Sequence, residues 1–126
     1  MNLQLDRIGQ IAITVHDLDR AVAFYRDTLG MRFLFQVPNL AFFDCGGIRI
    51  LLGRPEKPEQ DHPGSVLYFK VADIQASWAA LMENGVKAIE PPVLVAPMKD
   101  HDLWIGAFED LDGNPLALMA EVPRSS

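Results

Sequence analysis

The residues of this sequence that could do chemistry are few and widely spaced. His101 and Asp102 are adjacent, and a histidine beside a carboxylate can move a proton near neutral pH. Neighbouring residues of a strand point to opposite faces, however, so a direct His101–Asp102 dyad is disfavoured and a polar loop residue is the simpler interpretation of His101. Cys45 ends an apolar run, and we expect a small buried residue there rather than a nucleophile.

The composition excludes several classes of partner. The chain has 17 acidic against 11 Lys and Arg residues, a formal net charge of −6, and no basic run, so neither nucleic acid nor an anionic membrane is an expected partner. Its apolar runs are too short to span a bilayer. A single cysteine cannot form an internal disulfide, which favours a reducing compartment. We therefore expect a cytoplasmic protein.

The segment 8–30 contains the first elements that could position a site. Ile11, Ile13 and Val15 alternate with other residues, which predicts a strand with Gln10 on the opposite face. The spacing then becomes helical after Asp17, a favourable N-cap residue, and Gly30 provides the helix end. The sequence thus predicts a strand followed by a helix.

The same pattern returns at 66–74 and continues as a helix to Gly85. A repeat of this length indicates a duplicated module rather than a solenoid. We expect one domain, 1–126, made of module one (7–53), an exposed Pro- and Gly-containing linker (54–64) and module two (65–122). Each module should be β-α-β-β-β. Its predicted core residues are apolar and face the helices: Ile11, Ile13, Val15, Phe24, Leu29, Leu67, Phe69, Val71, Trp78, Leu81 and Leu118.

Several short motifs occur in a specific order along this repeat. They are Val15-x-Asp17-Leu18, Ala23-Phe24-Tyr25-Arg26, Leu29-Gly30 and Asp112-Gly113-Asn114. Together they resemble the vicinal oxygen chelate superfamily, which includes glyoxalase I, bleomycin- and fosfomycin-resistance proteins, extradiol dioxygenases and methylmalonyl-CoA epimerase. The resemblance covers nearly the whole chain. It implies an α+β fold in which two βαβββ modules form a curled mixed-sheet cup, the glyoxalase/bleomycin resistance-like fold.

The resemblance also implies positions for the ligands of a divalent metal ion. The first falls on Gln10, and glutamine does occur there in some family members. The other three fall on Leu51, Val66 and Ala117, where the family usually has Glu, His and Glu. Apolar side chains offer no oxygen or nitrogen in exchange for the lost hydration of the cation. We therefore expect no cofactor, with a divalent metal involving Gln10 as the alternative.

The cup implied by the resemblance predicts a small-molecule site with a mainly apolar lining. The alternatives are a metal-independent binding protein for a small, partly aromatic or amphipathic compound, and an enzyme such as a lyase, isomerase or dioxygenase with other ligands or with acid–base groups. We also expect a homodimer, which commonly completes the cup in family members of this length. The predicted ligand contacts are Gln10, Thr14, Arg49, Leu51, Val66, Tyr68, Lys70, Trp104, Ala117 and Met119, with His101 as a possible rim residue.

Overall fold

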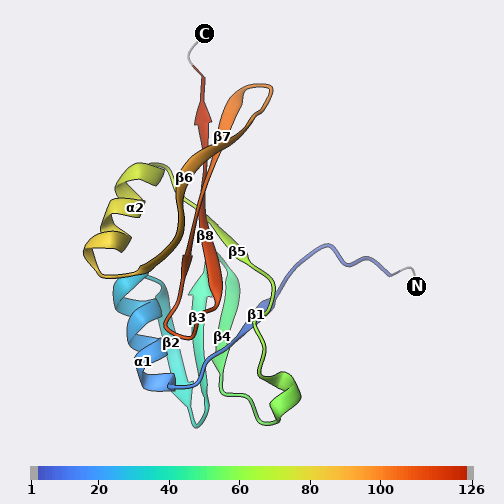
Figure 1. Ribbon diagram of the computed structural model, residues 1–126. Helices are drawn as coiled ribbons and strands as arrows, with labels where there is room; N and C mark the ends of the chain where they lie inside the picture. The colour runs from blue at the N-terminus through green and yellow to red at the C-terminus, as the bar shows by residue number, and fades with distance from the viewer. Residues whose placement is uncertain (1–2, 125–126) are drawn as a thin grey trace. The chain divides into compact units, whose positions relative to one another are not determined.

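A computed structural model of the chain describes residues 3–124. The chain divides into two compact units, unit 1 up to Gly64 and unit 2 from Ser65 onward. Each unit contains one four-stranded mixed sheet with a helix on one face (Figure 1). The predicted α+β class and the two β-α-β-β-β modules are confirmed.

Unit 1 begins with a strand that leads into a helix. Its elements are β1 (Gln10–Thr14), α1 (Leu18–Ala23), η1 (Phe24–Thr28), β2 (Arg32–Val37), β3 (Leu40–Cys45), β4 (Ile48–Gly53) and the 3₁₀ turn η2 (Pro58–Gln60). The sheet order is β1-β4-β3-β2, in which β1 and β4 are parallel and the other neighbours antiparallel. The hairpin of β3 and β4 turns at Gly46 and Gly47, both with positive φ.

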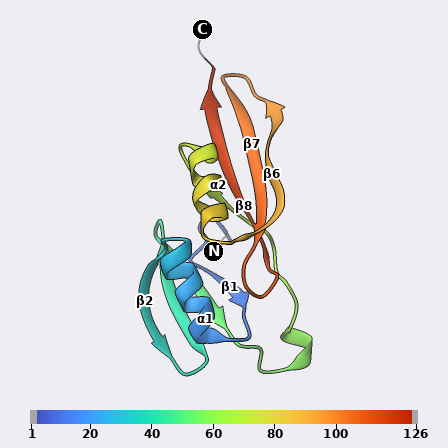
Figure 2. The same cartoon turned by 60° about the vertical axis from the view of Figure 1, so that its left-hand side comes forward.

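Unit 2 repeats this order. Its elements are β5 (Leu67–Lys70), α2 (Ile74–Glu83), β6 (Lys87–Pro97), β7 (His101–Glu109) and β8 (Pro115–Pro123). The sheet order is β5-β8-β7-β6, with β5 and β8 parallel. The pairing of β6 with β7 shifts register around Pro91 and Pro92, as expected where prolines remove ladder donors. Figure 2 shows each helix lying along its own sheet.

The two helices start in the same way but differ farther along. Asp17 accepts a hydrogen bond from the Arg20 amide and Asp73 from the Ala76 amide, each at 3.1 Å, so both are N-caps. The predicted first helix does not remain α-helical. It continues as the π turn η1, in which the Leu29 amide donates to the Phe24 carbonyl at 3.0 Å. None of the helices within residues 3–124 has the length and apolarity needed to cross a membrane.

The core of each unit lies between its helix and its sheet. Of the residues predicted to be buried, Ile13, Val15, Phe24, Leu81 and Leu118 are buried. The other six are only half-buried: Ile11, Leu29, Leu67, Phe69, Val71 and Trp78. For the strand residues the reason is topological, because β1 and β5 are edge strands of their sheets and their side chains have a neighbouring strand on one side only.

Candidate functional site

In unit 1, the sheet face opposite α1 carries four of the ten predicted ligand contacts. We call it open face 1. Strand pairing places Gln10 beside Arg49, Ala12 beside Leu51 and Thr14 beside Gly53. Paired residues point to the same side of a sheet, and the alternate residues Ile50 and Leu52 are buried in the core on the other side. Gln10, Thr14, Arg49 and Leu51 therefore share open face 1.

One row of open face 1 is polar. Across the four strands it runs Arg32, Asp44, Arg49 and Gln10. It contains two guanidinium groups, one carboxylate and one carboxamide. Arg49 forms no ion pair with any residue in 3–124, although Asp44 is its cross-strand neighbour. The row is thus a positively charged strip on a chain whose overall charge is −6.

The next row of open face 1 is apolar and aromatic. It runs Phe35, Phe42, Leu51 and Ala12. The Phe35 and Phe42 rings stack with their centroids 4.5 Å apart and their planes 25° apart, and Phe35 keeps 48% of its surface exposed. The Arg49 guanidinium carbon lies 5.8 Å from the centroid of Phe42, which links this row to the polar one.

Phe35 and Phe42 were absent from the predicted contacts, although one of them was accessible from the sequence. A two-residue Gly46-Gly47 turn sets the register of its hairpin, and that register places Phe42 opposite Leu51. Phe35 had no such signal, because a bulge between Phe33 and Phe35 changes the face on which the later residues of β2 lie.

Thr14 is less available than the other residues of open face 1. Its hydroxyl donates to the carbonyl of Gln60 in η2 at 3.4 Å, so the linker lies against this end of β1. Nearby, the His16 Nε2 lies 2.7 Å from Asp61 Oδ1, which fastens the same segment. The linker 54–64 was expected to be exposed, and all of its residues except the half-buried Pro55 are exposed, although Gln60 and Asp61 bond to residues at the end of β1.

The corresponding face of unit 2, opposite α2, is open face 2. Strand pairing places Tyr68 beside Ala117 and Lys70 beside Met119. Tyr68 is 53% exposed, whereas Ala117 is only 1% exposed, and the contact of Ala117 with a ligand stays a prediction. Lys70 Nζ lies 3.4 Å from Glu121 Oε2, and its charge is therefore partly compensated. Val66 is exposed just before β5.

Trp104 lies on the side of the sheet that carries α2. Trp104 pairs with Ala120 of β8. Gly106 lies two residues farther along the same strand and faces α2, because a Cβ added to Gly106 would lie 3.1 Å from the Trp78 ring. The register of β7 with β8 is regular, so Trp104 and Gly106 share a face. Trp104 therefore lies on the face opposite to open face 2, and its contact with a ligand stays a prediction.

His101 is part of β7 and not of a loop, and its parity places it on open face 2. Its Nδ1 lies 2.7 Å from Asp100 Oδ1 and its Nε2 lies 3.8 Å from Glu121 Oε2. The hydrogen bond with His101, first among several causes, lowers the pKa of Asp100 below its ordinary value. Asp102 instead accepts from Arg124 Nη1 at 2.7 Å, so the expected lack of a His101–Asp102 dyad is confirmed.

Cys45 is half-buried at the end of β3. Burial, and to a smaller degree the neighbouring Asp44 carboxylate, raises the pKa of its thiol above the ordinary value. A thiol whose anion is disfavoured is a weak nucleophile and a weak metal ligand.

The residues at the four implied metal positions do not fit a metal ion. Gln10 offers one carboxamide oxygen, while Leu51, Val66 and Ala117 offer no donor atoms. Within the part of the chain that the structure describes, no group of three or more His, Cys, Asp or Glu side chains could hold an ion. Hard cations need several oxygen or nitrogen ligands, which these positions do not provide.

Comparison with known proteins gives a consistent family assignment. The sequence model of the Glyoxalase/Bleomycin resistance protein/Dioxygenase superfamily matches residues 7–118. The metallothiol transferase FosB of Staphylococcus epidermidis is 28% identical over 119 residues, covering 88% of this chain and 81% of FosB.

Solved structures give the same result for the fold. A member of that superfamily from Sphaerobacter thermophilus DSM 20745 superposes with a TM-score of 0.77 at 26% identity, covering 94% of this chain and all (100%) of the other. Lactoylglutathione lyase from Agrobacterium tumefaciens gives a TM-score of 0.76 at 21% identity, covering 93% and 95% of the two chains.

Proposed function

We propose a metal-independent ligand-binding function for this chain, which belongs to the Glyoxalase/Bleomycin resistance protein/Dioxygenase superfamily. The proposed ligand is a small, planar aromatic acid bound on open face 1. The observation that carries this proposal is the pairing of a cationic row containing Arg49 with an aromatic row containing Phe35 and Phe42.

The two rows match the two parts of such a ligand. A flat apolar body would lie on Phe42 and Leu51, where stacking and removal of apolar surface from water both favour binding. Its carboxylate or phenolate would then reach the neighbouring polar row, where Arg49 can donate a bidentate pair of hydrogen bonds and Gln10 a further one. An ordinary solvated sheet face would not keep stacked phenyl rings exposed to water.

Open face 2 carries the predicted polar contacts of unit 2. Tyr68, with its exposed ring and hydroxyl, would orient a ligand that binds on that face. Lys70 is a weaker candidate because Glu121 already lies within 3.4 Å of its ammonium group. Met119 beside Lys70 offers an adaptable apolar contact.

The test uses 2-naphthoate as the probe and 2-naphthamide, its uncharged analogue, as the control ligand. Binding is measured by isothermal titration calorimetry on the full chain. Arg49→Met keeps the aliphatic stem of the side chain and removes its charge. We expect it to weaken 2-naphthoate binding about tenfold, which corresponds to roughly 1.4 kcal/mol of binding free energy. The affinity for 2-naphthamide should be unaffected. Leu51→Trp should obstruct both ligands.

The matched control is Arg54→Met, which removes a guanidinium from the same unit outside the two rows. It should bind 2-naphthoate like the unaltered protein. Equal affinity of Arg49→Met and the parent for the acid, or undiminished binding in Leu51→Trp, would place binding somewhere other than open face 1.

Independence from metal is part of the same proposal. It is supported by the absence of donor atoms at Leu51, Val66 and Ala117. Elemental analysis of protein purified without chelators should find no stoichiometric transition metal, and 2-naphthoate affinity should be unchanged by EDTA. One tightly bound ion per chain that is lost in Gln10→Ala would contradict this part.

A second candidate function is a proton-transfer enzyme without metal. It is supported by the Asp100–His101 hydrogen bond, which orients the imidazole so that Nε2 faces Glu121 on open face 2. With 2-oxo-4-phenylbutanoate in D₂O, this candidate predicts deuterium exchange at C3 faster than in buffer, and loss of that excess in His101→Gln. Binding without exchange favours the first proposal.

We further propose a cytoplasmic homodimer. Support for the compartment is the single cysteine. Support for the dimer is β6, an edge strand with exposed Val93, Leu94 and Val95. Sedimentation equilibrium at micromolar concentration should give twice the chain mass of 14.0 kDa, and Val95→Lys should shift the protein toward the single-chain mass. A parent that already sediments as one chain would refute the dimer.

A further inference from the structure

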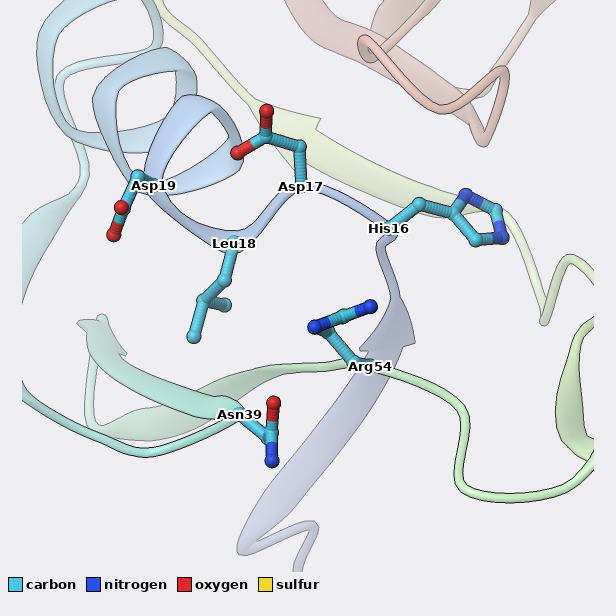
Figure 3. A pocket seen from close by; sticks show the side chains of 6 residues that line it. All are labelled: His16, Asp17, Leu18, Asp19, Asn39 and Arg54. Atoms are coloured by element: carbon cyan, nitrogen blue, oxygen red, sulfur yellow. The ribbon is translucent and has the colours of Figure 1, made fainter.

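A separate pocket of about 380 Å³ lies in unit 1, at the end of the sheet rather than on its open face. It is lined by His16, Asp17, Leu18, Asp19, Asn39 and Arg54 (Figure 3). Its volume is within the range of small-molecule sites. None of these residues belongs to the polar and aromatic rows of open face 1.

The position of the pocket follows from the topology of unit 1. β1 and β4 are parallel, and Val15, just past β1, donates its amide to the Gly53 carbonyl at 3.0 Å. His16 and Arg54 then leave the carboxyl ends of these two strands side by side. Ligands of open sheets with parallel strands bind beyond such ends, where the chain diverges into loops.

The walls of the pocket are held by interactions of their own. The Arg54 amide donates to the Asn39 carbonyl at 3.2 Å, and Asn39 has a positive φ of 68°, which fixes the tight turn between β2 and β3. On the other side, His16 is fastened to Asp61 at 2.7 Å. The pocket is therefore built from three segments that are each fixed in place.

The pocket presents opposite charges to one ligand. Among residues 3–124 the Arg54 guanidinium has no carboxylate partner, and Figure 3 shows it between Asn39 and the turn that carries His16 and Asp17. Asp17 accepts from the Arg20 amide and Asp19 from Gln36 Nε2, each at 3.1 Å and each through Oδ1. A carboxylate has about four lone-pair positions, so Asp19 retains capacity to accept further donors. Figure 3 shows the Asp17 carboxylate turned away from Arg54 and Asn39, and it serves as the helix N-cap.

These charges discriminate between classes of ligand. A phosphate or sulfate would be attracted by Arg54 but repelled by the two carboxylates, and a simple ammonium ion would meet the reverse arrangement. A molecule that carries both an anion and a cation satisfies both sides. We propose that this pocket binds a small zwitterion of the α-amino acid class, with its carboxylate on Arg54 and Asn39 and its ammonium on Asp19.

The experiment uses three probes of nearly equal size. L-glutamine carries both charges, glutaramate lacks the ammonium group and 4-aminobutanamide lacks the carboxylate. Titration of the ¹⁵N-labelled full chain, followed by two-dimensional NMR, should show saturable shifts at His16, Asp19, Asn39 and Arg54. L-glutamine should bind at least about fivefold tighter than either single-charge analogue, since each lost charge-assisted contact costs roughly 1 kcal/mol or more.

Two variants and a control test the assigned contacts. Arg54→Met and Asp19→Asn should each weaken L-glutamine binding at least about fivefold, and in Arg54→Met the preference for L-glutamine over 4-aminobutanamide should vanish. Arg49→Met, altered on open face 1, should bind L-glutamine normally. Absence of shifts at 10 mM probe, equal binding of the three probes, or shifts centred on other residues would overturn the proposal. Arg54→Met is the test variant for L-glutamine and the control for 2-naphthoate, and Arg49→Met is the reverse. Failure of one proposal is therefore distinguishable from failure of the other.

Discussion

The turn between β7 and β8 depends on one buried carboxylate, Asp110, and its replacement by alanine should destabilise the fold. Asp110 is 5% exposed and its oxygens accept from the Asp112 amide, the Asn114 amide and Asn114 Nδ2, at 2.8 to 2.9 Å. Each bond to a charged acceptor contributes about 1 kcal/mol or more, and the buried Asn114 donors would be left without this acceptor. We expect Asp110→Ala to lower the free energy of unfolding by about 3 kcal/mol.

Urea denaturation followed by circular dichroism measures this change. With an m value of about 1.5 kcal/mol/M, a loss of about 3 kcal/mol lowers the midpoint by about 2 M. Leu111→Ala is the control, because Leu111 belongs to the same turn and is exposed, so its substitution should change the free energy of unfolding by less than about 0.5 kcal/mol. The reasoning is refuted if Asp110→Ala unfolds at the same urea concentration as Leu111→Ala with an unchanged m value.

Two further predictions concern unit 2. The pKa of Asp100 is lowered by its bond with His101, so this bond stabilises the fold above the ordinary carboxyl pKa of 3.8, and the contribution is lost as the pH falls through the lower folded pKa. In His101→Ala, NMR titration should show the Asp100 pKa rising toward 3.8. An unchanged pKa would assign the shift to another cause. Gly106→Ala should lower the free energy of unfolding by about 1–3 kcal/mol and perturb tryptophan fluorescence, because the added Cβ would lie 3.1 Å from Trp78 and Pro92. The control Gly64→Ala, where no atom lies within 4 Å of the added Cβ, should leave the free energy of unfolding unchanged. Equal stability of the two variants would show that Trp78 and Pro92 move aside without cost.

The sequence predicted the fold well where a local signal had one structural solution. The N-caps Asp17 and Asp73 and the positive-φ glycines Gly30 and Gly85 set the helix bounds of both modules. The two-residue turn at Gly46 and Gly47 set the β3–β4 register. The module bounds 7–53 and 65–122 within a single domain remain predictions, since the compact units are divided at Gly64 without a test of those limits.

Prediction failed where packing decided between local alternatives. The π turn after Ala23 leaves the apolar spacing helical, so periodicity could not reveal it. The bulge in β2 and the irregular pairing of β6 change which face a residue occupies. Pro91 and Pro92 mark the irregularity in β6, but no turn residue marks the bulge in β2. For Trp104, only the pairing of β7 with β8 assigns its face.

The candidate site shows the same division. Gln10, Thr14, Arg49 and Leu51 could be placed on one face because strand alternation and the family resemblance agreed. The interaction of His101 with Asp100, rather than Asp102, depended on the hairpin end of β6 and β7, where adjacent residues are no longer constrained to opposite sides. Arg54 was read as part of a linker, because a pocket formed by the ends of β1, β3 and β4 has no signature in any single segment.

The absence of donor atoms at the implied metal positions and the presence of an aromatic row on open face 1 both bear on how a ligand could be held. A metal site orders a ligand through strong, directional bonds to a few oxygen atoms, and it needs hydrophilic side chains that point from the sheet. Leu51 removes such a group from β4 and at the same time extends the apolar row of Phe35 and Phe42. The sheet is unchanged by this exchange, because the residues of an open face alternate with those of the core and can vary without disturbing Ile50 or Leu52. Under the proposed function, selectivity would come from Arg49, which would recognise the charge of a ligand, and from the Phe35 and Phe42 rings, which would recognise its shape.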